Sequence, residues 1–427
     1  MATSVLSIAS SYLGFPTKST IEPYKLRDVP KGATQYDSKA TVRALPSSWY
    51  TSSEIYAIER RAIFSKRWLF MTHRSRFKQP GDFLRYEVAG FDVNIVLDRS
   101  GKINAFHNVC RHRAYPVNEA KSGNKKILSC RYHGWSYGLD GKLAKAPGYQ
   151  DFPSFDKSAN GLLPVHVHID GNGFIYINLD ASSTPIPWTK DFDSVDRQAR
   201  FQDFNFSDYE LDHTYDLQGH YNWKLLADNF NECYHCKTTH ADVPTFLTID
   251  SHDLAAKDGH MQHDSATTEE QRRMGLSVNS TYFFPNASMT ITPHFMMLQK
   301  FLPSSATESA MSYEIYRNKH SSEVDFKLIS EAYARVMAED KELCAGQQRN
   351  LDAGVYEAGE LHPRWEKGPL YVQSQVREAV TEHFELEKQA GNQIWPANHV
   401  SAVETGGEED ICAALEKCAE DGKVLAW

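Results

Sequence analysis

The sequence predicts an α+β fold in two parts, an all-β domain followed by a larger domain in which helices flank an antiparallel sheet. Short strand and turn signals fill the segment from Gly81 to Leu179. Strand-like segments return between Tyr282 and Arg317, and helical patterns follow at about 323–351 and 371–389. A chain of 427 residues is long enough for two domains and a large core.

The composition excludes several classes of protein. The net charge is −9 and basic runs stay short, so we expect no nucleic-acid partner. No apolar run approaches a membrane span, so we expect no membrane association. The first fifteen residues lack the positive region of a secretory signal and the arginines of a mitochondrial one. An odd count of seven cysteines argues against a disulfide framework, and we therefore expect a cytoplasmic protein.

The chain is expected to divide into three segments. Its beginning is rich in Pro, Gly, Ser and Thr, which predicts an arm with little regular structure. Pro185 and Pro187 indicate a linker farther along. The predicted segments are an arm over 1–45, a first domain over 46–185 and a second domain over 186–427.

The first domain is expected to open with a helix. Thr51–Glu54 matches a capping box, so this helix should begin there and run to about Lys66. β structure should start near Trp68. Further strands are expected at about 83–88, 93–97 and 174–179, with hairpin turns at 98–101 and 139–142.

The second domain is expected to begin with a strand over Tyr209–Leu217 and an amphipathic helix from about Tyr221. The polar segment 251–273 should form a loop over the site, and the first long helix should end near Gly354. Antiparallel strands are expected at 282–284, 287–292, 295–301 and 310–317.

Four potential metal ligands lie in the first domain: Cys110, His112, Cys130 and His133. They form a C-x-H pair and a C-x-x-H pair separated by seventeen residues. Two Cys and two His could bind zinc or an iron–sulfur cluster. A zinc finger usually groups like ligands, whereas each pair here mixes Cys with His, as in a Rieske [2Fe–2S] centre. The following Gly134–Tyr137 supplies a tight turn and a hydroxyl that could donate to cluster sulfur.

A second candidate site combines Glu232, His235 and His240. If the helix continues, Glu232 and His235 share a face, and the backbone must bend before His240 to aim both imidazoles at one ion. Two histidines and a distant carboxylate can form the facial triad of a non-haem Fe(II) site. Taken alone, such histidines are more often solvated or capping groups.

With both motifs in this order, the sequence resembles the oxygenase (alpha) component of the Rieske non-haem iron oxygenases over about residues 45–400. The segment Asn231–Cys236 is most similar to the choline and carnitine monooxygenase branch, because ring-hydroxylating members usually have Asp where Glu232 stands. The resemblance implies that His235 and His240 bind iron. It also implies that Glu232 connects His235 to His133 of a neighbouring subunit.

The third iron ligand implied by the resemblance is Asp340. The segment Ala338–Cys344, followed by Gln348, matches the Glu-Asp-x-x-Leu-Cys pattern of the branch. Read by itself, this charged run would be a solvated helix face. Glu339 and Asp352 remain alternative ligands.

The resemblance implies an all-β Rieske domain beside a catalytic domain with a helix-grip, START-like sheet. The implied enzyme is a monooxygenase that contains a Rieske [2Fe–2S] cluster and mononuclear Fe(II) and uses O2 as co-substrate. A separate flavin/iron–sulfur reductase or a ferredoxin would supply electrons from NAD(P)H. A homotrimer, or a multiple of it, would bring the two metal sites of different subunits together.

The implied reaction is oxidation of a C–H bond in a small substrate, for which a quaternary amine such as choline, carnitine or a betaine is preferred. An apolar or aromatic substrate, or an electron carrier without oxygenase activity, remains an alternative. Aromatic faces hold trimethylammonium groups through cation–π contacts, although aromatics at strand spacing are more often core. The candidate walls of the substrate pocket are Tyr282, Phe283, Phe284 and Phe295.

The remaining cysteines suggest no ligand pattern. Cys233 and Cys236 form a lone CxxC, which we interpret as two small buried packing residues. Cys344, Cys412 and Cys418 lack partners at ligand spacing.

Overall fold

The computed structural model describes residues 42–241, 243 and 247–399. These residues fall within one unit, Ser38–Trp427. Nearly all of the predicted arm, together with Cys412 and Cys418, lies outside the described residues. In the described part of the chain, no helix is long and apolar enough to cross a membrane.

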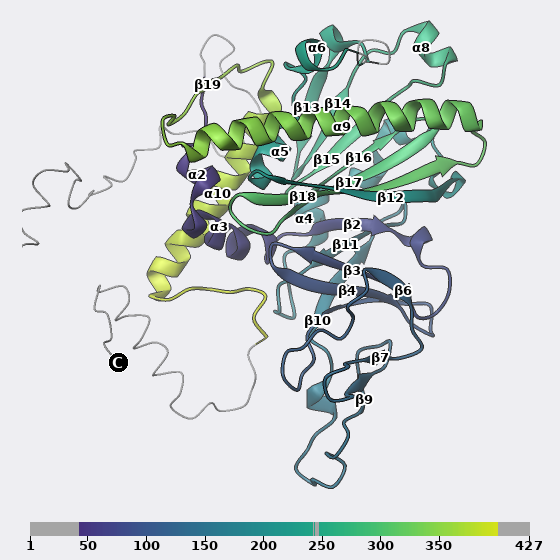
Figure 1. Ribbon diagram of the computed structural model, residues 1–427, viewed down its shortest axis with the longest axis vertical. Coiled ribbons are helices and arrows are strands. Elements are labelled where there is room, and N and C mark those ends of the chain that lie inside the picture. The colour runs from purple at the N-terminus through teal and green to yellow at the C-terminus, as the bar shows by residue number, and fades with distance from the viewer. Residues whose placement is uncertain (1–41, 242, 244–246, 400–427) are drawn as a thin grey trace, which may run out of the picture. The chain divides into compact units, whose positions relative to one another are not determined.

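The predicted α+β architecture is confirmed, and its first part is built on two sheets. The larger sheet has the order β2-β11-β10-β5-β4-β3-β6, and β7, β8 and β9 form a small sheet below it in Figure 1. The bounds are β2 Leu69–His73, β3 Asp82–Val88, β4 Phe91–Leu97, β5 Ile103–His107, β6 Ser122–Asn124, β7 Leu128–Ser129, β8 Ser136–Tyr137, β9 Leu143–Lys145, β10 Pro164–Ile169 and β11 Phe174–Asn178.

Both predicted hairpin turns are present in this part. One joins β4 to β5, where the Asp98 carboxylate accepts hydrogen bonds from the backbone N–H groups of Ser100 and Lys102. Gly101 adopts a φ of +85° there, a conformation that favours glycine. The other joins β8 to β9. Asp, Ser and Gly therefore specify these turns through local hydrogen bonds and backbone freedom.

The leading helix begins one residue later than predicted. Short α2 covers Ser48–Thr51, and α3 covers Ser53–Glu59 before a π-helical turn, Arg60–Phe64. Ser52 is the N-cap of α3, because its extended backbone lets its hydroxyl accept from the N–H groups of Glu54 and Ile55. Thr51 belongs to α2, so its assignment as the cap was wrong.

The second part is a seven-stranded antiparallel sheet with the order β12-β18-β17-β16-β15-β14-β13. The long helix α9, Glu323–Asp352, crosses this sheet in Figure 1, and α10 spans Lys367–Ala390. The strands are β12 Tyr209–His220, β13 Asp253–Lys257, β14 His260–Asp264, β15 Asn279–Phe283, β16 Ala287–Ile291, β17 Phe295–Pro303 and β18 Glu308–Asn318.

Two boundaries in this part differ from the predictions. The segment 251–273 was expected to be a loop, but β13, β14 and α8, Glu269–Arg273, occupy most of it. β14 pairs with β13 on one side and with β15 on the other. Leu254 on β13 and Met261 on β14 are buried, so the sheet continues through a segment whose sequence looks polar. α10 begins before the predicted residue 371, because Pro369 in the first turn of a helix removes no hydrogen bond.

The remaining elements are short. β1 pairs with β19 across a long sequence separation, and α4 follows the first part of the chain. These elements are β1 Val42–Arg43, β19 Glu360–Leu361, α4 Trp188–Phe192 and the 3-10 turns Arg74–Arg76, Ser158–Asn160, Val195–Arg197, Ala199–Phe201, Phe206–Asp208 and Ile249–Ser251.

A buried ionic network joins the two large sheets at Glu314 on β18. Its carboxylate lies 3.1 Å from Lys300 Nζ and 3.0 Å from Arg76 Nη1, and the Tyr86 and Thr72 hydroxyls donate to it. Burial alone would raise the pKa of Glu314, but Lys300 and Arg76 outweigh it and lower this pKa from 4.5 to about 2. The carboxylate is therefore ionised, and its negative charge balances the positive charges of Lys300 and Arg76.

Replacing Glu314 by glutamine is expected to lower the free energy of unfolding by about 3–5 kcal/mol, because buried Lys300 and partly buried Arg76 lose their partner. The folded-state pKa of Glu314 lies below 4.5, so its contribution should be present above pH 4.5 and disappear as the pH falls toward 2. Urea unfolding at several pH values measures both effects. Exposed Glu210→Gln on β12 is the matched control and should change stability by less than about 0.5 kcal/mol. Equal stability of the two variants would contradict the assignment.

Candidate metal centres

The helix α5, Trp223–Phe230, leads directly into the segment that contains the first candidate centre. Its N-cap is Asn222, whose side chain accepts from Lys224 N–H and whose own N–H donates to Gln348 of α9 at 2.8 Å. Fully buried Lys224 lies 2.6 Å from Glu59 of α3. These bonds fix α5 between α3 and α9, so the end of α5 has a defined position.

α5 ends before Glu232, which corrects the predicted helical spacing of Glu232 and His235. Asn231 is the C-cap, and the next helix, α6, covers only Cys236–Thr239. The chain thus leaves α5 before both histidines, and α6 lies between them and ends directly before His240, whose backbone is extended, as the predicted bend requires. A Cβ on Gly368 of α10 would lie 1.8 Å from the Asn231 carbonyl oxygen, so only glycine allows α10 to approach this chain reversal.

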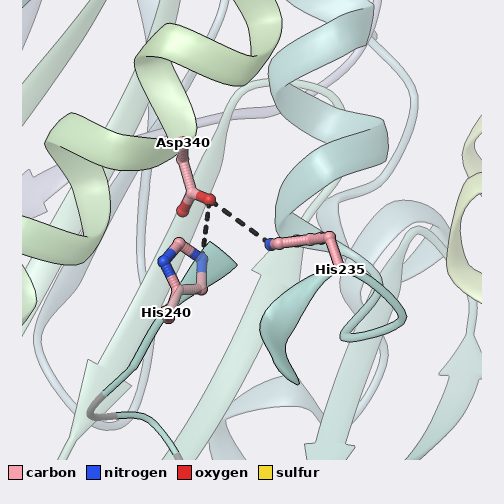
Figure 2. Close-up of side chains that lie close together, drawn as sticks. All are labelled: His235, His240 and Asp340. Atoms are coloured by element: carbon pink, nitrogen blue, oxygen red, sulfur yellow. Dashed lines mark hydrogen bonds and ion pairs between the residues drawn. The ribbon is translucent and has the colours of Figure 1, made fainter. Parts of the chain in front are cut away.

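The structure brings His235, His240 and Asp340 together. Asp340 Oδ1 lies 3.3 Å from His235 Nε2 and 3.1 Å from His240 Nε2, and Figure 2 shows the carboxylate projecting from α9 between the two rings. In the described part of the chain, this is the one group of three or more potential metal ligands whose atoms all lie within 4.8 Å of one another.

Each histidine has a second carboxylate on its other ring nitrogen. Glu232 Oε1 lies 2.5 Å from His235 Nδ1, and Glu339 Oε2 lies 2.6 Å from His240 Nδ1. A carboxylate at Nδ1 holds the proton there and leaves Nε2 as the lone-pair donor, which is how metal-binding histidines are usually oriented. Both Nε2 atoms face the same side of Asp340, so the donor set suits one divalent metal ion with open positions.

The electrostatics of the group favour a cation at this point. Burial lowers the pKa of His235, but hydrogen bonds to Asp340 and Glu232 outweigh burial and raise the pKa to about 9. The pKa of His240 is raised for the same reasons, by Asp340 and Glu339. Burial raises the pKa of Asp340, yet its bonds to both histidines bring it below the usual value. Positive charge is therefore favoured at the point where the three side chains meet.

The two alternative third ligands lie elsewhere. Glu339 is the neighbour of Asp340 on α9, where consecutive side chains diverge by about 100°, and it reaches the far nitrogen of His240 instead. Asp352 Oδ2 lies 2.7 Å from His220 Nε2 at the end of α9. Neither carboxylate therefore belongs to the group formed by His235, His240 and Asp340.

The second candidate centre consists of two similar loops in the first part of the chain. In each loop the Cys N–H donates to the carbonyl five residues on, from Cys110 to Tyr115 and from Cys130 to Trp135, both at 2.9 Å. Gly134 has a φ of +72°, as predicted for a tight turn. The Tyr137 hydroxyl lies 3.3 Å from Cys110 Sγ. The two Cys-His loops thus fold alike.

Within this centre the two histidine side chains lie next to each other. His112 Nδ1 lies 3.1 Å from His133 Nδ1, the His112 ring stacks on Trp135, and both cysteines are buried. A zinc ion would draw all four ligand atoms to within about 4 Å of one another. Among the described residues these four do not form such a group, which fits two cysteines on one metal and two histidines on another.

A cavity of about 110 Å³ lies beside the His235/His240/Asp340 group. None of the four predicted aromatic walls lines it. Phe283 stacks on Phe70 in the core, the Tyr282 hydroxyl donates to Pro285 O, and Phe284 and Phe295 are buried. The lining comprises Asn229, Phe230, Glu232, Cys233, His235, Cys236, His240, Val243, Leu247, His252, His263, Asp264, Ser265, Val278, Ser280, Thr290, Tyr333, Val336, Met337 and Asp340.

Sequence reasoning missed the aromatic residues of this cavity. Phe230 is the last residue of α5, and Tyr333 lies two helical turns before Asp340 on α9. The helical spacing of Tyr333 from Asp340, seven residues on one helix, was a usable signal. His252 and His263 come from the polar segment that was expected to cover the site, and this part of the expectation agrees with the lining.

Cys233 and Cys236 are buried, as expected, but they form a disulfide with Cα atoms 4.9 Å apart, so their interpretation as free thiols was wrong. A turn brings the two Cys side chains of this CxxC together. Cys344 is free and buried, as expected.

The two candidate centres lie far apart within the described chain. In Figure 1 the loops with β7 and β9 are at the bottom and α6 is at the top, with both large sheets between them. Transfer of an electron between the centres of one chain would have to cross this distance.

Two family models match different parts of the chain, and each match contains one of the two candidate centres. Residues 67–156 match the Rieske [2Fe-2S] domain, and residues 206–382 match the ring hydroxylating alpha subunit (catalytic domain). The first match contains the Cys110/His112/Cys130/His133 loops and the second contains the His235/His240/Asp340 group.

Relatives of known activity match over most of their lengths. The carnitine monooxygenase oxygenase subunit of Acinetobacter pittii is 29% identical over 322 residues, which cover 73% of this chain and 86% of the relative. The chloroplastic choline monooxygenase of Spinacia oleracea is 27% identical over 372 residues, which cover 83% and 82%.

Solved structures match as well. The quaternary ammonium Rieske monooxygenase CntA in complex with L-carnitine is 26% identical with a TM-score of 0.70, covering 79% of this chain and 96% of that chain. A further structure of a quaternary ammonium Rieske monooxygenase, with a TM-score of 0.71, 26% identity and the same coverage, is described as giving insight into carnitine oxidation and inter-subunit electron transfer.

Proposed function

We propose that this chain, which belongs to the Rieske non-haem iron oxygenases, oxidises a C–H bond of a small quaternary amine. As an enzyme of this family it uses a Rieske [2Fe–2S] cluster, a mononuclear iron and O2. The observation that best supports this proposal is the cavity beside His235, His240 and Asp340. Its lining combines carboxylates with the aromatic rings of Phe230 and Tyr333.

In this proposal Cys110, His112, Cys130 and His133 hold the cluster, and His235, His240 and Asp340 hold the mononuclear iron. The iron held there would supply O2 activation, and the cluster would pass on electrons from the reductase. Two electrons and two protons per O2 would balance the conversion of a substrate C–H bond to C–OH with release of one water. The fit rests on the donor types, on the convergence of both Nε2 atoms on Asp340 and on the paired Cys and His of the two loops.

The protein's own contribution is to orient the ligands. Glu232 and Glu339 keep protons on the Nδ1 atoms of His235 and His240 and so direct each Nε2 toward the iron. Glu232 also accepts from the backbone N–H groups of Tyr234 and His235, which fixes its carboxylate at the surface of the centre. Phe230 and Tyr333 line the same cavity, so their aromatic rings can contact a cationic group there.

Oxidation beside a quaternary nitrogen would give a carbinol that cleaves to an amine and an aldehyde, whereas choline would be oxidised at its alcohol carbon. The named relatives include enzymes of both kinds, acting on carnitine and on choline. An apolar or aromatic substrate fits the cavity less well, because carboxylates line it.

We further propose that the chain works as a homotrimer, or a multiple of it, and receives electrons from a separate reductase or ferredoxin. The separation of the two centres in Figure 1 supports this, since a head-to-tail ring would place His133 of one subunit near Glu232 of the next. His133 is exposed and Glu232 partly exposed, so both can take part in an interface. We also propose a cytoplasmic location, because an odd count of seven cysteines argues against a disulfide framework.

The test is a panel of choline, L-carnitine, glycine betaine and aromatic acids, assayed by O2 uptake with a surrogate reductase and by product analysis. We expect product formation with at least one quaternary amine and none with aromatic acids. Coupled turnover of only aromatic substrates would contradict the proposal. The iron content distinguishes the electron-carrier alternative, because an oxygenase holds about three iron atoms per chain and a carrier about two.

A further inference from the structure

A disulfide lies directly beside the proposed iron site. It joins Cys233 to Cys236, which flank the proposed ligand His235 along the chain, and both cysteines line the cavity of about 110 Å³. Both residues are buried, with 8% and 6% of their surfaces exposed. The bond therefore borders the space in which O2 and a substrate would meet.

The cytoplasmic location proposed above makes a disulfide unexpected. Disulfides are rare in that compartment, and those that form there are mostly transient, catalytic or redox-sensing. The other cysteines that the structure describes are free. A bond that closes a ring over only two intervening residues also removes little conformational entropy from the unfolded chain, so it adds little stability. Redox chemistry at the active centre explains its presence better than stabilisation of the fold does.

The disulfide also constrains the groups that hold Glu232. The Glu232 carboxylate accepts hydrogen bonds from the N–H groups of Tyr234 and His235, and both donors lie inside the ring that the bond closes. The same carboxylate lies 2.5 Å from His235 Nδ1. Opening the bond would shift this ring, because two sulfur atoms that are no longer bonded cannot stay at bonding distance. The redox state of the cysteines is therefore coupled to the position of Glu232.

Cys233 is the sulfur that an external reductant can reach. It lines a second, smaller hollow that Cys236 does not line. Arg364 also lines this hollow and is exposed, so the hollow extends toward solvent. A thiolate opens a disulfide by attacking one sulfur while the other leaves. The lining therefore makes Cys233 the attacked sulfur and Cys236 the leaving group.

We propose that Cys233 and Cys236 form a reversible redox site that regulates the oxygenase. Hydrogen peroxide closes the bond, a dithiol reopens it, and the closed form holds Glu232 in place for rapid turnover. The effect on turnover rests on the function proposed above, whereas the chemistry of the bond can be measured without it.

The proposed steps balance. In closure, two thiols and one H2O2 give one disulfide and two molecules of water, so that the thiols lose two electrons and two protons to the peroxide. Hydrogen peroxide is the two-electron reduction product of O2, the co-substrate. In reopening, a dithiol attacks Cys233, passes two electrons and two protons to the bond and becomes a disulfide itself. The second cysteine also ends the oxidation before the irreversible sulfinic acid forms.

Mass spectrometry of the full-length holoenzyme tests the bond itself. The folded enzyme is treated anaerobically with dithiothreitol and desalted, and one half is then given hydrogen peroxide. Both halves are denatured, alkylated and digested. We expect the peptide that contains Cys233 and Cys236 to carry two alkyl groups after reduction and none after about one equivalent of peroxide. A bond that resists dithiothreitol in the folded enzyme, or thiols that peroxide converts to sulfinic acid, would overturn the proposal.

Turnover of the same two samples shows whether the bond regulates the enzyme, with the iron content measured in each. The reduced form should oxidise its amine about three- to tenfold more slowly than the closed form, because Glu232 is held less firmly. Equal rates would overturn the regulatory role. If the bond opens and closes but neither form oxidises a quaternary amine, the proposed function fails and the regulatory part of this inference fails with it.

Two variants separate the disulfide from a general effect of thiols. Cys236→Ala cannot form the bond and should keep the slow rate of the reduced enzyme after either treatment. Cys344→Ala removes the free, buried cysteine of α9 and should keep the difference between the reduced and closed forms. A response to peroxide that persists in the Cys236 variant, or that disappears in the Cys344 variant, would contradict the assignment.

Discussion

Replacing Asp340 by alanine is expected to remove the mononuclear iron, so that the iron content falls from about three to about two atoms per chain. Asp340 is the carboxylate to which both Nε2 atoms converge, at 3.3 and 3.1 Å, and alanine leaves two neutral donors. Loss of a residue that only orients a ligand already costs about 10–100-fold in metal affinity. We therefore expect oxygenation to fall by at least about a hundredfold.

Metal analysis, visible absorption and product formation check this result together. The cluster absorption should remain, because the two Cys-His loops lie far from α9 in Figure 1. Glu339→Gln should weaken iron binding less than Asp340→Ala, since Glu339 contacts only the far nitrogen of His240. Glu342→Gln, an exposed change on the same helix, should alter neither quantity. Full iron content in the Asp340 variant would exclude Asp340 as a ligand.

Replacing Glu232 by glutamine is expected to leave both metal centres loaded and to slow turnover by roughly a hundredfold. A glutamine oxygen can still accept from His235 Nδ1, so the ring keeps its orientation. The carboxylate that accepts from His235 and from two backbone N–H groups loses its charge, and with it the proposed connection to His133 of the next subunit.

Stopped-flow absorption of the pre-reduced enzyme separates this effect from simple loss of metal. With substrate and O2 present, the cluster should be reoxidised slowly in Glu232→Gln and rapidly in the parent protein. Glu366→Gln, a half-buried acid near Glu232, is the control and should keep the parent rate. A parent-like rate in the Glu232 variant would show that electrons reach the iron by a route without Glu232.

The sequence predicted most of the fold because its signals were local. Turn residues marked the hairpin at Asp98–Gly101, and alternating apolar residues marked the strands on either side of it. The errors fell where neighbours in space decide the outcome. β13 and β14 look polar along the chain, yet they complete a sheet whose edge needs hydrogen-bonding partners.

Most of the candidate ligands could also be predicted from the sequence. The spacing of Cys110, His112, Cys130 and His133 limited the chemistry to a few clusters, and Glu232, His235 and His240 lie close along the chain. The structure brings His235 and His240 to Asp340, a residue one hundred positions beyond His240. No periodicity in the chain connects these residues, and the choice of Asp340 over Glu339 depended on the family pattern.

By itself, then, the sequence determined the two-part α+β architecture, the types of metal ligand and the family, because these depend on residue identity and short spacings. Only the tertiary structure decided that α5 ends before Glu232, that Glu339 orients His240 and that Phe230, Tyr333 and Asp264 line the cavity. Those features depend on how α5, α9 and β14 pack together. Packing between distant segments leaves no repeating pattern in a single chain, so the cavity and its charge could be identified only in three dimensions.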